Sequence, residues 1–182
     1  MNKKIILGVL SFFLAFSMSA QSIKSDIKKI KKSYKEIVKN KDSYINKSTD
    51  LMGGSSEGGH AIAYFEDNNI RLIDVTWYGE MGKTARSYYY KNEKLFFIFE
   101  EIYTYNAPIY YDKEAAKEDN SVAFFDDKKT TRLENRYYYK NNELIRVLDH
   151  TKKEQNLSLI ETKENGNRLL KEAFDLKIDF VD

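Results

Sequence analysis

The hydrophobic and polar positions between residues 57 and 150 repeat one pattern: an aromatic or β-branched run, a short polar turn, and a second such run. Two copies, Tyr88–Phe96 and Tyr137–Ile145, share a tyrosine triplet followed by Lys-Asn, and Tyr64–Arg71 is a weaker copy. This pattern is typical of β-hairpins. Three hairpins in series predict six antiparallel strands in meander order, at 60–66, 70–78, 84–91, 94–105, 131–140 and 143–150.

The side chains of a strand alternate between the two faces of its sheet, so each tyrosine triplet is divided between them. Tyr89 and Tyr138 are expected on one face, and the opposite face receives Tyr88, Tyr90, Tyr137 and Tyr139. These rings can form cross-strand pairs that fix the strand register. They can also line a concave face that stacks on sugar rings or on a partner protein. Repetition of the triplet at equivalent hairpin positions favours the structural role.

Helical segments are expected to cover both faces of the sheet, because the strand predicted at 94–105 is apolar on both sides. Apolar residues at intervals of three and four predict an amphipathic helix at 22–39, whose other face is dominated by lysines. We favour a solvated role for these lysines over a site for anionic lipid, glycan or nucleic acid. A second helical segment is predicted from Lys153, with Gly166 marking a break or a close contact, and a short strand at 177–181. The predicted fold class is α+β, with both helical segments packed on a six-stranded antiparallel meander sheet.

The start of the chain is typical of a secretory signal peptide. Two lysines precede an apolar run of about twelve residues, and small residues precede the expected cut between Ala20 and Gln21. The run is shorter than the roughly 20 apolar residues that span a bilayer. We therefore expect a signal peptide at 1–20 and a single α+β domain at 21–182, with its sheet at about 60–150. The domain is expected to be periplasmic or secreted, without stable membrane insertion after cleavage.

Charge and cysteine content narrow the function classes. Removal of the signal peptide leaves 28 basic and 28 acidic side chains, so the mature chain offers no overall electrostatic case for nucleic acid. The sequence contains no cysteine, which excludes disulfides and a nucleophilic thiol. A mature chain of about 160 residues suits one domain with one core.

The sequence carries no recognisable catalytic or metal-binding motif. Its two histidines, His60 and His150, lie at the outer ends of the first and last predicted strands, whereas a metal site needs three or four converging ligands. Glu100 and Glu101 are adjacent in a strand and should point to opposite faces. We therefore predict no cofactor, no metal and no enzymatic activity. A hydrolase that combines one of these glutamates with one of the histidines is the third hypothesis for function.

Two segments between the predicted elements differ from ordinary turns. Residues 53–59 are rich in glycine but lack the strand–turn–helix context of a phosphate-binding loop, so they are interpreted as a mobile entry to the first strand. Residues 106–129 contain the only proline and many apolar side chains, so we expect them to fold back over one end of the sheet. Asp112 followed by two alanines predicts a short helix there. Long packed loops often carry function, which makes this segment the first candidate for a binding edge.

The Glu57-Gly58-Gly59 entry and the Tyr-Tyr-Tyr-Lys-Asn turns resemble those of a group of exported bacterial proteins with no assigned activity. The hairpins are also similar, more distantly, to Tyr-x-x-Asn-Gly-x-Leu repeats of bacterial envelope proteins. Glu93 and Asn142 stand where those repeats usually carry glycine. The resemblance covers 57–150, implies the hairpin fold, and supplies no catalytic residue.

The leading hypothesis for function is an exported, non-catalytic binding or interaction module of the cell envelope or periplasm, with a protein or glycan partner. The alternative is a small-molecule or glycan carrier with a cavity under the curved sheet. The expected binding patch lies near strand ends and in the long loop, and comprises Trp77, Tyr78, Tyr103, Tyr105, Tyr110 and Tyr111.

Overall fold

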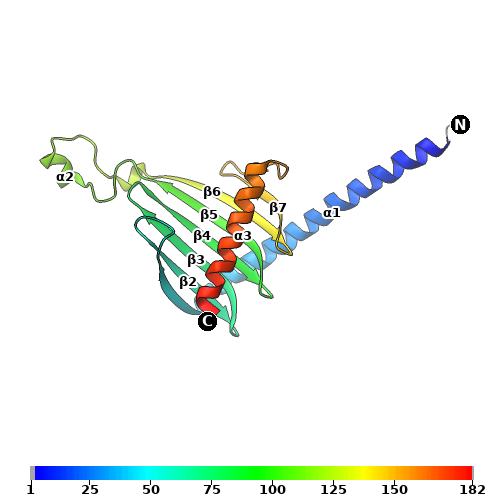
Figure 1. Ribbon diagram of the computed structural model, residues 1–182, viewed down its shortest axis with the longest axis horizontal. Helices are drawn as coiled ribbons and strands as arrows, with labels where there is room; N and C mark the ends of the chain where they lie inside the picture. The colour runs from blue at the N-terminus through cyan, green and yellow to red at the C-terminus, as the bar shows by residue number, and fades with distance from the viewer. Residues whose placement is uncertain (1–2, 182) are drawn as a thin grey trace.

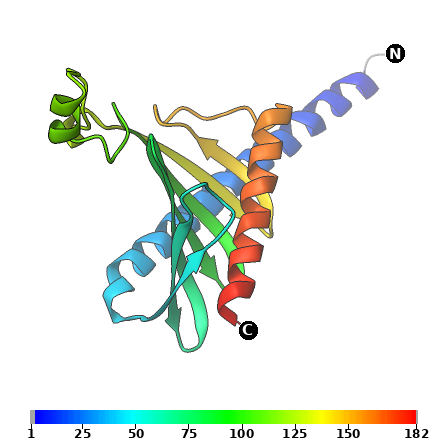
Figure 2. The ribbon, with the colours of Figure 1, turned by 60° about the vertical axis from the view of Figure 1, so that its left-hand side comes forward.

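The computed structural model describes residues 3–181, with side-chain surroundings for residues 22–180. A single antiparallel sheet lies between two helices, α1 (Lys3–Asn40) on one face and α3 (Ile160–Val181) on the other (Figures 1 and 2). Short helical turns occur at η1 (Lys41–Ser43), α2 (Lys113–Glu118) and η2 (Asp127–Lys129). The predicted signal peptide, residues 1–20, lies outside the residues whose side chains are described, so it stays a prediction. No helix among the described residues is long and apolar enough to cross a membrane.

The sheet follows strict meander order, in which each strand pairs with the next one in the chain. Its strands are β1 (Ile45–Leu51), β2 (Gly59–Glu66), β3 (Asn69–Gly79), β4 (Gly82–Lys91), β5 (Lys94–Thr104), β6 (Thr131–Lys140) and β7 (Glu143–Leu148). The predicted α+β class and antiparallel meander are confirmed. The predicted number of six strands is wrong, because β1 adds a seventh.

Strand β1 lies between the predicted helix at 22–39 and the glycine-rich segment at 53–59, where no strand is expected from the sequence. It is an edge strand that pairs only with β2, and most of its side chains are exposed. Ile45 is 73% exposed, and only Leu51 reaches the core. Because β1 buries a single side chain, its sequence lacks the alternation of apolar and polar residues from which a strand can be predicted.

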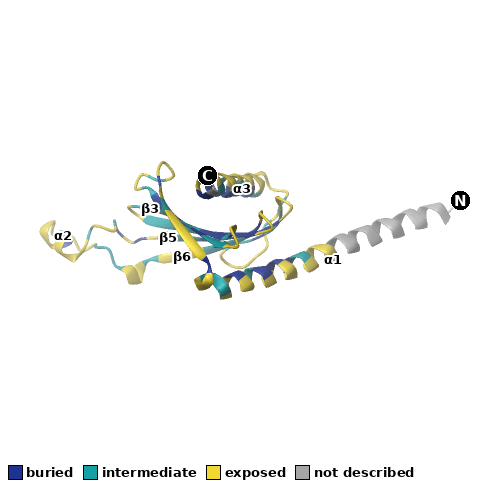
Figure 3. Ribbon diagram, turned by 90° about the horizontal axis from the view of Figure 1, so that it is seen from below, coloured by how far each residue is buried: buried dark blue, intermediate teal, exposed yellow. Residues whose placement is uncertain are grey.

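The tyrosine triplets divide between the two faces as the alternation predicts. Tyr89 and Tyr138 pack against α1, in a cluster with Ile27, Ile30, Ile37, Tyr44, Leu72, Phe96 and Phe97. The other four tyrosines pack under α3, together with Ala61, Ala63, Ile73, Val75, Ile98, Leu169, Ala173, Leu176 and Phe180. All six tyrosines are buried, so the triplets form the core on both sides of the sheet. Figure 3 shows the buried part of the sheet between α1 and α3.

Helix α3 continues through Gly166, and the absence of a side chain at this position allows the helix to approach β7 closely. A Cβ atom on Gly166 would lie 2.6 Å from Cδ2 of Leu144. The hydroxyl of Tyr139 donates a 2.8 Å hydrogen bond to the Gly166 carbonyl oxygen. Of the two interpretations of this glycine, the close contact is therefore confirmed.

The C-terminal boundaries differ from the prediction. The helix begins at Ile160, not near Lys153, and the strand expected at 177–181 is wrong because the helix continues to Val181. Its last turns bury Leu176 and Phe180, which are four residues apart and face the sheet together. Helical spacing thus outweighs the short local alternation.

Three hairpins turn through pairs of residues that both have positive φ, as two-residue type I′ turns require. The pairs are Asp67-Asn68, Asn92-Glu93 and Asn141-Asn142. None contains glycine, and Glu93 adopts φ +62° without the asparagine or glycine usually found there. The hairpin pattern in the sequence is confirmed at each of these turns.

The β5–β6 connection projects beyond the end of the sheet and does not fold back over it (Figure 1). It is attached to the β3–β4 turn by the Tyr105 and Ile109 amides, which donate to Met81 O at 2.9 Å and Glu80 O at 3.1 Å. The predicted short helix is present as α2, and the Asp112 side chain caps it by accepting hydrogen bonds from two backbone amides. This connection therefore lengthens one end of the molecule.

Candidate functional site

A cleft of about 580 Å³ opens on the α3 side of the sheet, beside the β3–β4 turn. Helix α3 crosses the sheet obliquely, so the distal parts of β3 to β5 extend past it (Figure 1). The volume falls within the roughly 300–1,000 Å³ typical of small-molecule sites. The lining residues are Gly54, Ser55, Trp77, Tyr78, Gly79, Gly82, Lys83, Thr84, Arg86, Tyr103, Arg168 and Glu172.

Trp77 in β3 is held by the glycine-rich segment that precedes β2. A Cβ atom on Gly54 would lie 2.2 Å from the indole ring, and one on Gly59 would lie 2.5 Å from it. The glycines therefore allow the backbone to lie flat against the aromatic ring. The interpretation of this segment as a mobile entry overlooks this role, because the partner of the glycines lies about 20 residues further along the chain.

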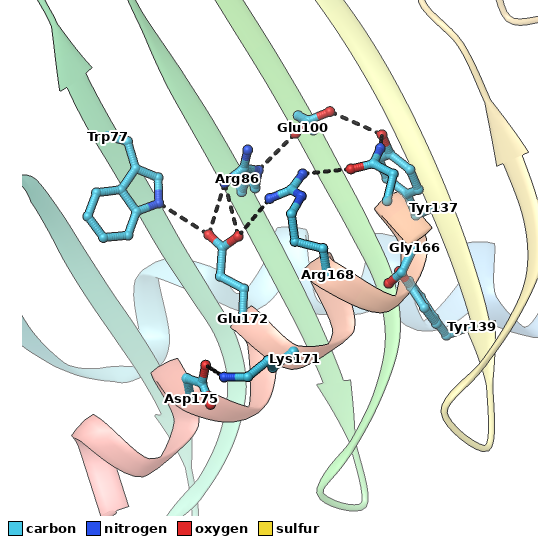
Figure 4. A network of polar contacts seen from close by, with 11 residues as sticks. Trp77, Arg86, Glu100, Tyr137, Tyr139, Gly166, Arg168, Lys171, Glu172 and Asp175 are labelled. Atoms are coloured by element: carbon cyan, nitrogen blue, oxygen red, sulfur yellow. Dashed lines mark hydrogen bonds and ion pairs between the residues drawn. The ribbon is translucent and has the colours of Figure 1, made fainter. Parts of the chain in front are cut away.

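A buried ion-pair network forms one wall of the cleft (Figure 4). Arg86 Nε donates to Glu100 Oε1 at 2.8 Å, and Arg86 Nη1 donates to Glu172 Oε1 at 2.9 Å. Trp77 Nε1 donates to the same Glu172 oxygen at 3.1 Å. One arginine thus bridges a carboxylate on the sheet and a carboxylate on α3, and the second carboxylate orients the indole.

The network continues from β6 into α3. Glu100 Oε2 accepts hydrogen bonds from Asn135 at 3.0 Å and from the Tyr137 hydroxyl at 3.2 Å. Asn165 donates to the Tyr137 hydroxyl at 2.9 Å and accepts from Arg168 at 2.6 Å. Four strands and one helix therefore fix the positions of these polar groups before any ligand binds.

The local environment keeps Glu100 ionised. Burial by itself raises the pKa of this carboxyl group, but hydrogen bonds from Asn135 and Arg86 and the arginine charge outweigh burial and lower the pKa below 4.5. Burial by itself lowers the pKa of Arg86, but interactions with Tyr88, Glu172 and Glu100 outweigh burial and raise this pKa. Glu100 is 3% exposed and both of its oxygens have partners, so it acts as a fixed charge within the wall.

The lining of the cleft includes three of the predicted patch residues, Trp77, Tyr78 and Tyr103. Only the Trp77 side chain faces α3, because Tyr78 and Tyr103 are in register with Lys83 and point to the opposite face of the sheet, together with Glu101. The Tyr103 ring is flanked by Lys83 Nζ at 4.9 Å, and its hydroxyl donates to Glu101 at 3.0 Å.

The other three predicted residues lie in the β5–β6 connection. Tyr105 is buried, with its ring centroid 5.2 Å from that of Phe125. Tyr110 donates to Glu80, and Tyr111 donates to Asp119 at 2.9 Å. These three side chains are therefore held by contacts within the β5–β6 connection and with the β3–β4 turn.

Sequence analysis missed Arg86, Arg168 and Glu172 as site residues. Glu100 ends the apolar run of β5, which is a usable signal, and Arg86 is its direct cross-strand partner. Finding Glu172 requires knowing where α3 crosses the sheet, which no local pattern gives.

The groups considered for hydrolysis do not meet at one point. Glu100 faces α3, whereas Glu101 faces the other side and pairs with Arg132, which confirms their predicted divergence. His60 in β2 contacts Asp50 at 3.0 Å, and His150 follows β7, at the far edge of the sheet. Within the described residues, no group of three histidine or acidic side chains is placed to hold a metal ion.

Comparison with models of protein families, with curated proteins and with solved structures finds no match to this chain.

Proposed function

We propose that this protein is an exported, non-catalytic binding module whose ligand site is the cleft beside Trp77. The observation that supports this proposal most directly is the Arg86–Glu100–Glu172–Trp77 network. Its charged groups neutralise one another and have partners within the protein, so they are suited to orienting a ligand. A general acid or base would need a side chain that can reach a reacting group, and Glu100 is enclosed.

A glycan is the partner that this cleft fits best. An aromatic ring with a polar edge, such as the indole of Trp77, can contact an amphipathic ligand while neighbouring groups form hydrogen bonds. Thr84, Ser55 and Arg168 supply such groups around the ring. Arg86 and Arg168 are paired with two carboxylates, Glu100 and Glu172, so these charges balance, which favours a ligand without a strong charge of its own.

Titration with neutral oligosaccharides, monitored by tryptophan fluorescence and calorimetry, tests this proposal. Trp77 is the only tryptophan in the chain, so its emission reports on the cleft alone. A chito- or malto-oligosaccharide is expected to shift the emission and release heat. Arg168→Ala should weaken binding roughly tenfold, because a hydrogen bond from a charged donor is lost.

Lys171→Ala is the matched control, because Lys171 lies on the same helix, is exposed, and pairs with Asp175 at 2.5 Å outside the cleft. This variant should bind like the wild type. The proposal would be overturned if no oligosaccharide produced heat or a change in emission, or if both variants lost affinity equally.

Export is tested separately by expressing the full chain in a Gram-negative host and sequencing the N-terminus of the periplasmic and secreted protein. The expected mature N-terminus is Gln21. Recovery of the uncut chain in the cytoplasm alone would contradict export and would leave the binding proposal in place.

A further inference from the structure

A second pocket lies on the opposite side of the sheet, between α1 and strands β5 and β6. It has a volume of about 370 Å³. Its lining residues are Ile30, Lys31, Tyr34, Lys35, Phe97, Phe99, Arg136 and Tyr138. Four of these residues are aromatic, three are cationic and none is acidic. The pocket therefore combines an apolar interior with a positively charged rim.

The apolar interior is rigid because its rings pack on one another. Tyr34 contacts Phe97 edge to face at a centroid distance of 5.2 Å, and Phe97 contacts Tyr138 at 5.0 Å. Phe97 and Tyr138 are buried, whereas Phe99 and Tyr34 are half-buried and border the opening. Such a surface accepts the apolar part of a ligand without rearranging.

The positive rim is formed by Lys31, Lys35 and Arg136. The two lysines are exposed, lie one helical turn apart, and take part in no ion pair among the described residues. Arg136 stacks on Phe99 with its guanidinium carbon 5.0 Å from the ring centroid, and its Nη2 donates to Glu134. Its Nη1 is buried and has no hydrogen-bond partner within the part of the chain that the structure describes.

The wider helix surface adds to this positive potential. Between residues 22 and 40, α1 carries seven lysines against Asp26 and Glu36, and Asp26 is already paired with Lys140 at 2.7 Å. A concave site with walls of low polarity concentrates such a field at its opening. The pocket therefore attracts anions in general, and its aromatic interior selects those that carry an apolar group.

We infer that this pocket binds an amphiphilic organic anion, with its apolar body on the aromatic rings and its acidic group among Lys31, Lys35 and Arg136. The chemistry corresponds to a medium-chain or aromatic carboxylate. A neutral sugar would leave the cations without a partner, and a polyanion without an apolar part would not use the rings. The site is distinct from the cleft beside Trp77, which lies on the other face of the sheet.

Calorimetric titration of the full chain with decanoate tests this inference, with decanol as the neutral probe of equal length. Decanoate is expected to bind at least about tenfold more tightly than decanol. The Lys31→Glu/Lys35→Glu variant should lose at least about tenfold in decanoate affinity, because two attractive charges become repulsive. The emission of Trp77 should stay unchanged during the titration, which distinguishes this pocket from the proposed glycan site.

The Lys32→Glu/Lys39→Glu variant is the matched control. It makes the same change in net charge on the same helix, at exposed positions that do not line the pocket. Its affinity for decanoate should fall less than about threefold. The inference would be overturned if decanoate did not bind, if decanol bound equally well, or if the two variants weakened binding to the same extent.

Discussion

Arg86 and Glu100 face each other across the β4–β5 pair, and the arginine Nε donates to the carboxylate at 2.8 Å. Their side chains are 12% and 4% exposed. A charge pair this deep in a sheet is stable only while both members are present, because either charge alone has lost its hydration. The pair therefore makes the wall of the cleft dependent on a single arginine.

Arg86→Met should lower the free energy of unfolding by about 3–5 kcal/mol, because Glu100 and Glu172 lose their common partner. Urea denaturation monitored by circular dichroism measures the change. The double variant Arg86→Met/Glu100→Leu should recover part of the loss, because it removes the stranded charge from the sheet. A loss below about 1 kcal/mol in the single variant would contradict a Glu100 side chain that is both buried and charged.

Acid should destabilise the protein partly through Glu100. The pKa of this group is lowered in the folded state relative to its ordinary value of 4.5, so its contribution is fully present above that value and is lost as pH falls through the lower folded-state pKa. Urea midpoints measured between about pH 6 and pH 3 should fall less steeply in Glu100→Gln than in the wild type. Parallel curves for the two proteins would contradict this assignment.

Alkali should reveal the burial of the tyrosine triplets. Burial raises the pKa of Tyr88, Tyr90 and Tyr139 far above 10.0, so the folded state keeps protons that the unfolded state releases. The resulting stability is present below pH 10 and is lost as pH rises further.

An absorbance titration at the tyrosinate band should therefore show exposed tyrosines ionising first and the triplets ionising in one cooperative step with unfolding. Protein in concentrated guanidinium chloride is the control, in which all 14 tyrosines should titrate together near pH 10. A single gradual titration of the native protein near pH 10 would contradict the burial of the triplets.

Gly54→Ala should displace the indole of Trp77, because the new methyl group would lie 2.2 Å from the ring. We expect a shift of the tryptophan emission and a loss of about 1–3 kcal/mol in the free energy of unfolding, typical of overpacking. Gly79→Ala is the control. Its new Cβ atom would lie 3.3 Å from the backbone oxygen of Gly82 and would not contact the indole. Identical spectra for the wild type and Gly54→Ala would show that the segment does not hold Trp77.

Much of the sheet follows from local patterns in the sequence. The six strands expected from alternation and turn residues are present, and the division of the triplets between the faces follows from strand geometry alone. Strand β1 was missed because it contributes only Leu51 to the core, and its pairing is satisfied by backbone hydrogen bonds. The role of Gly166 as a close contact depends on Leu144, which lies 22 residues earlier in the chain.

The candidate site is less accessible to sequence reasoning. Trp77, Tyr78 and Tyr103 were singled out because they cluster near strand ends, and all three belong to the lining of the cleft. Predicting Arg86 as a site residue requires the register of β4 against β5, and predicting Glu172 requires the angle at which α3 crosses the sheet. Predicting the cationic rim of the second pocket requires knowing which face of α1 packs near Phe99, because the sequence alone does not distinguish the lysines of that helix. Pairings over long sequence separations decide each of these cases.

The meander order also bears on biosynthesis. Each strand pairs with the strand that follows it in the chain, so hairpins can form progressively as the chain emerges. Helix α3 follows every strand in the chain. The sheet face bearing Tyr88 and Tyr139 therefore remains exposed to water until residues 160–181 have emerged. A chain that has emerged only as far as β7 therefore exposes a broad apolar surface, and this stage of folding is the one most prone to aggregation.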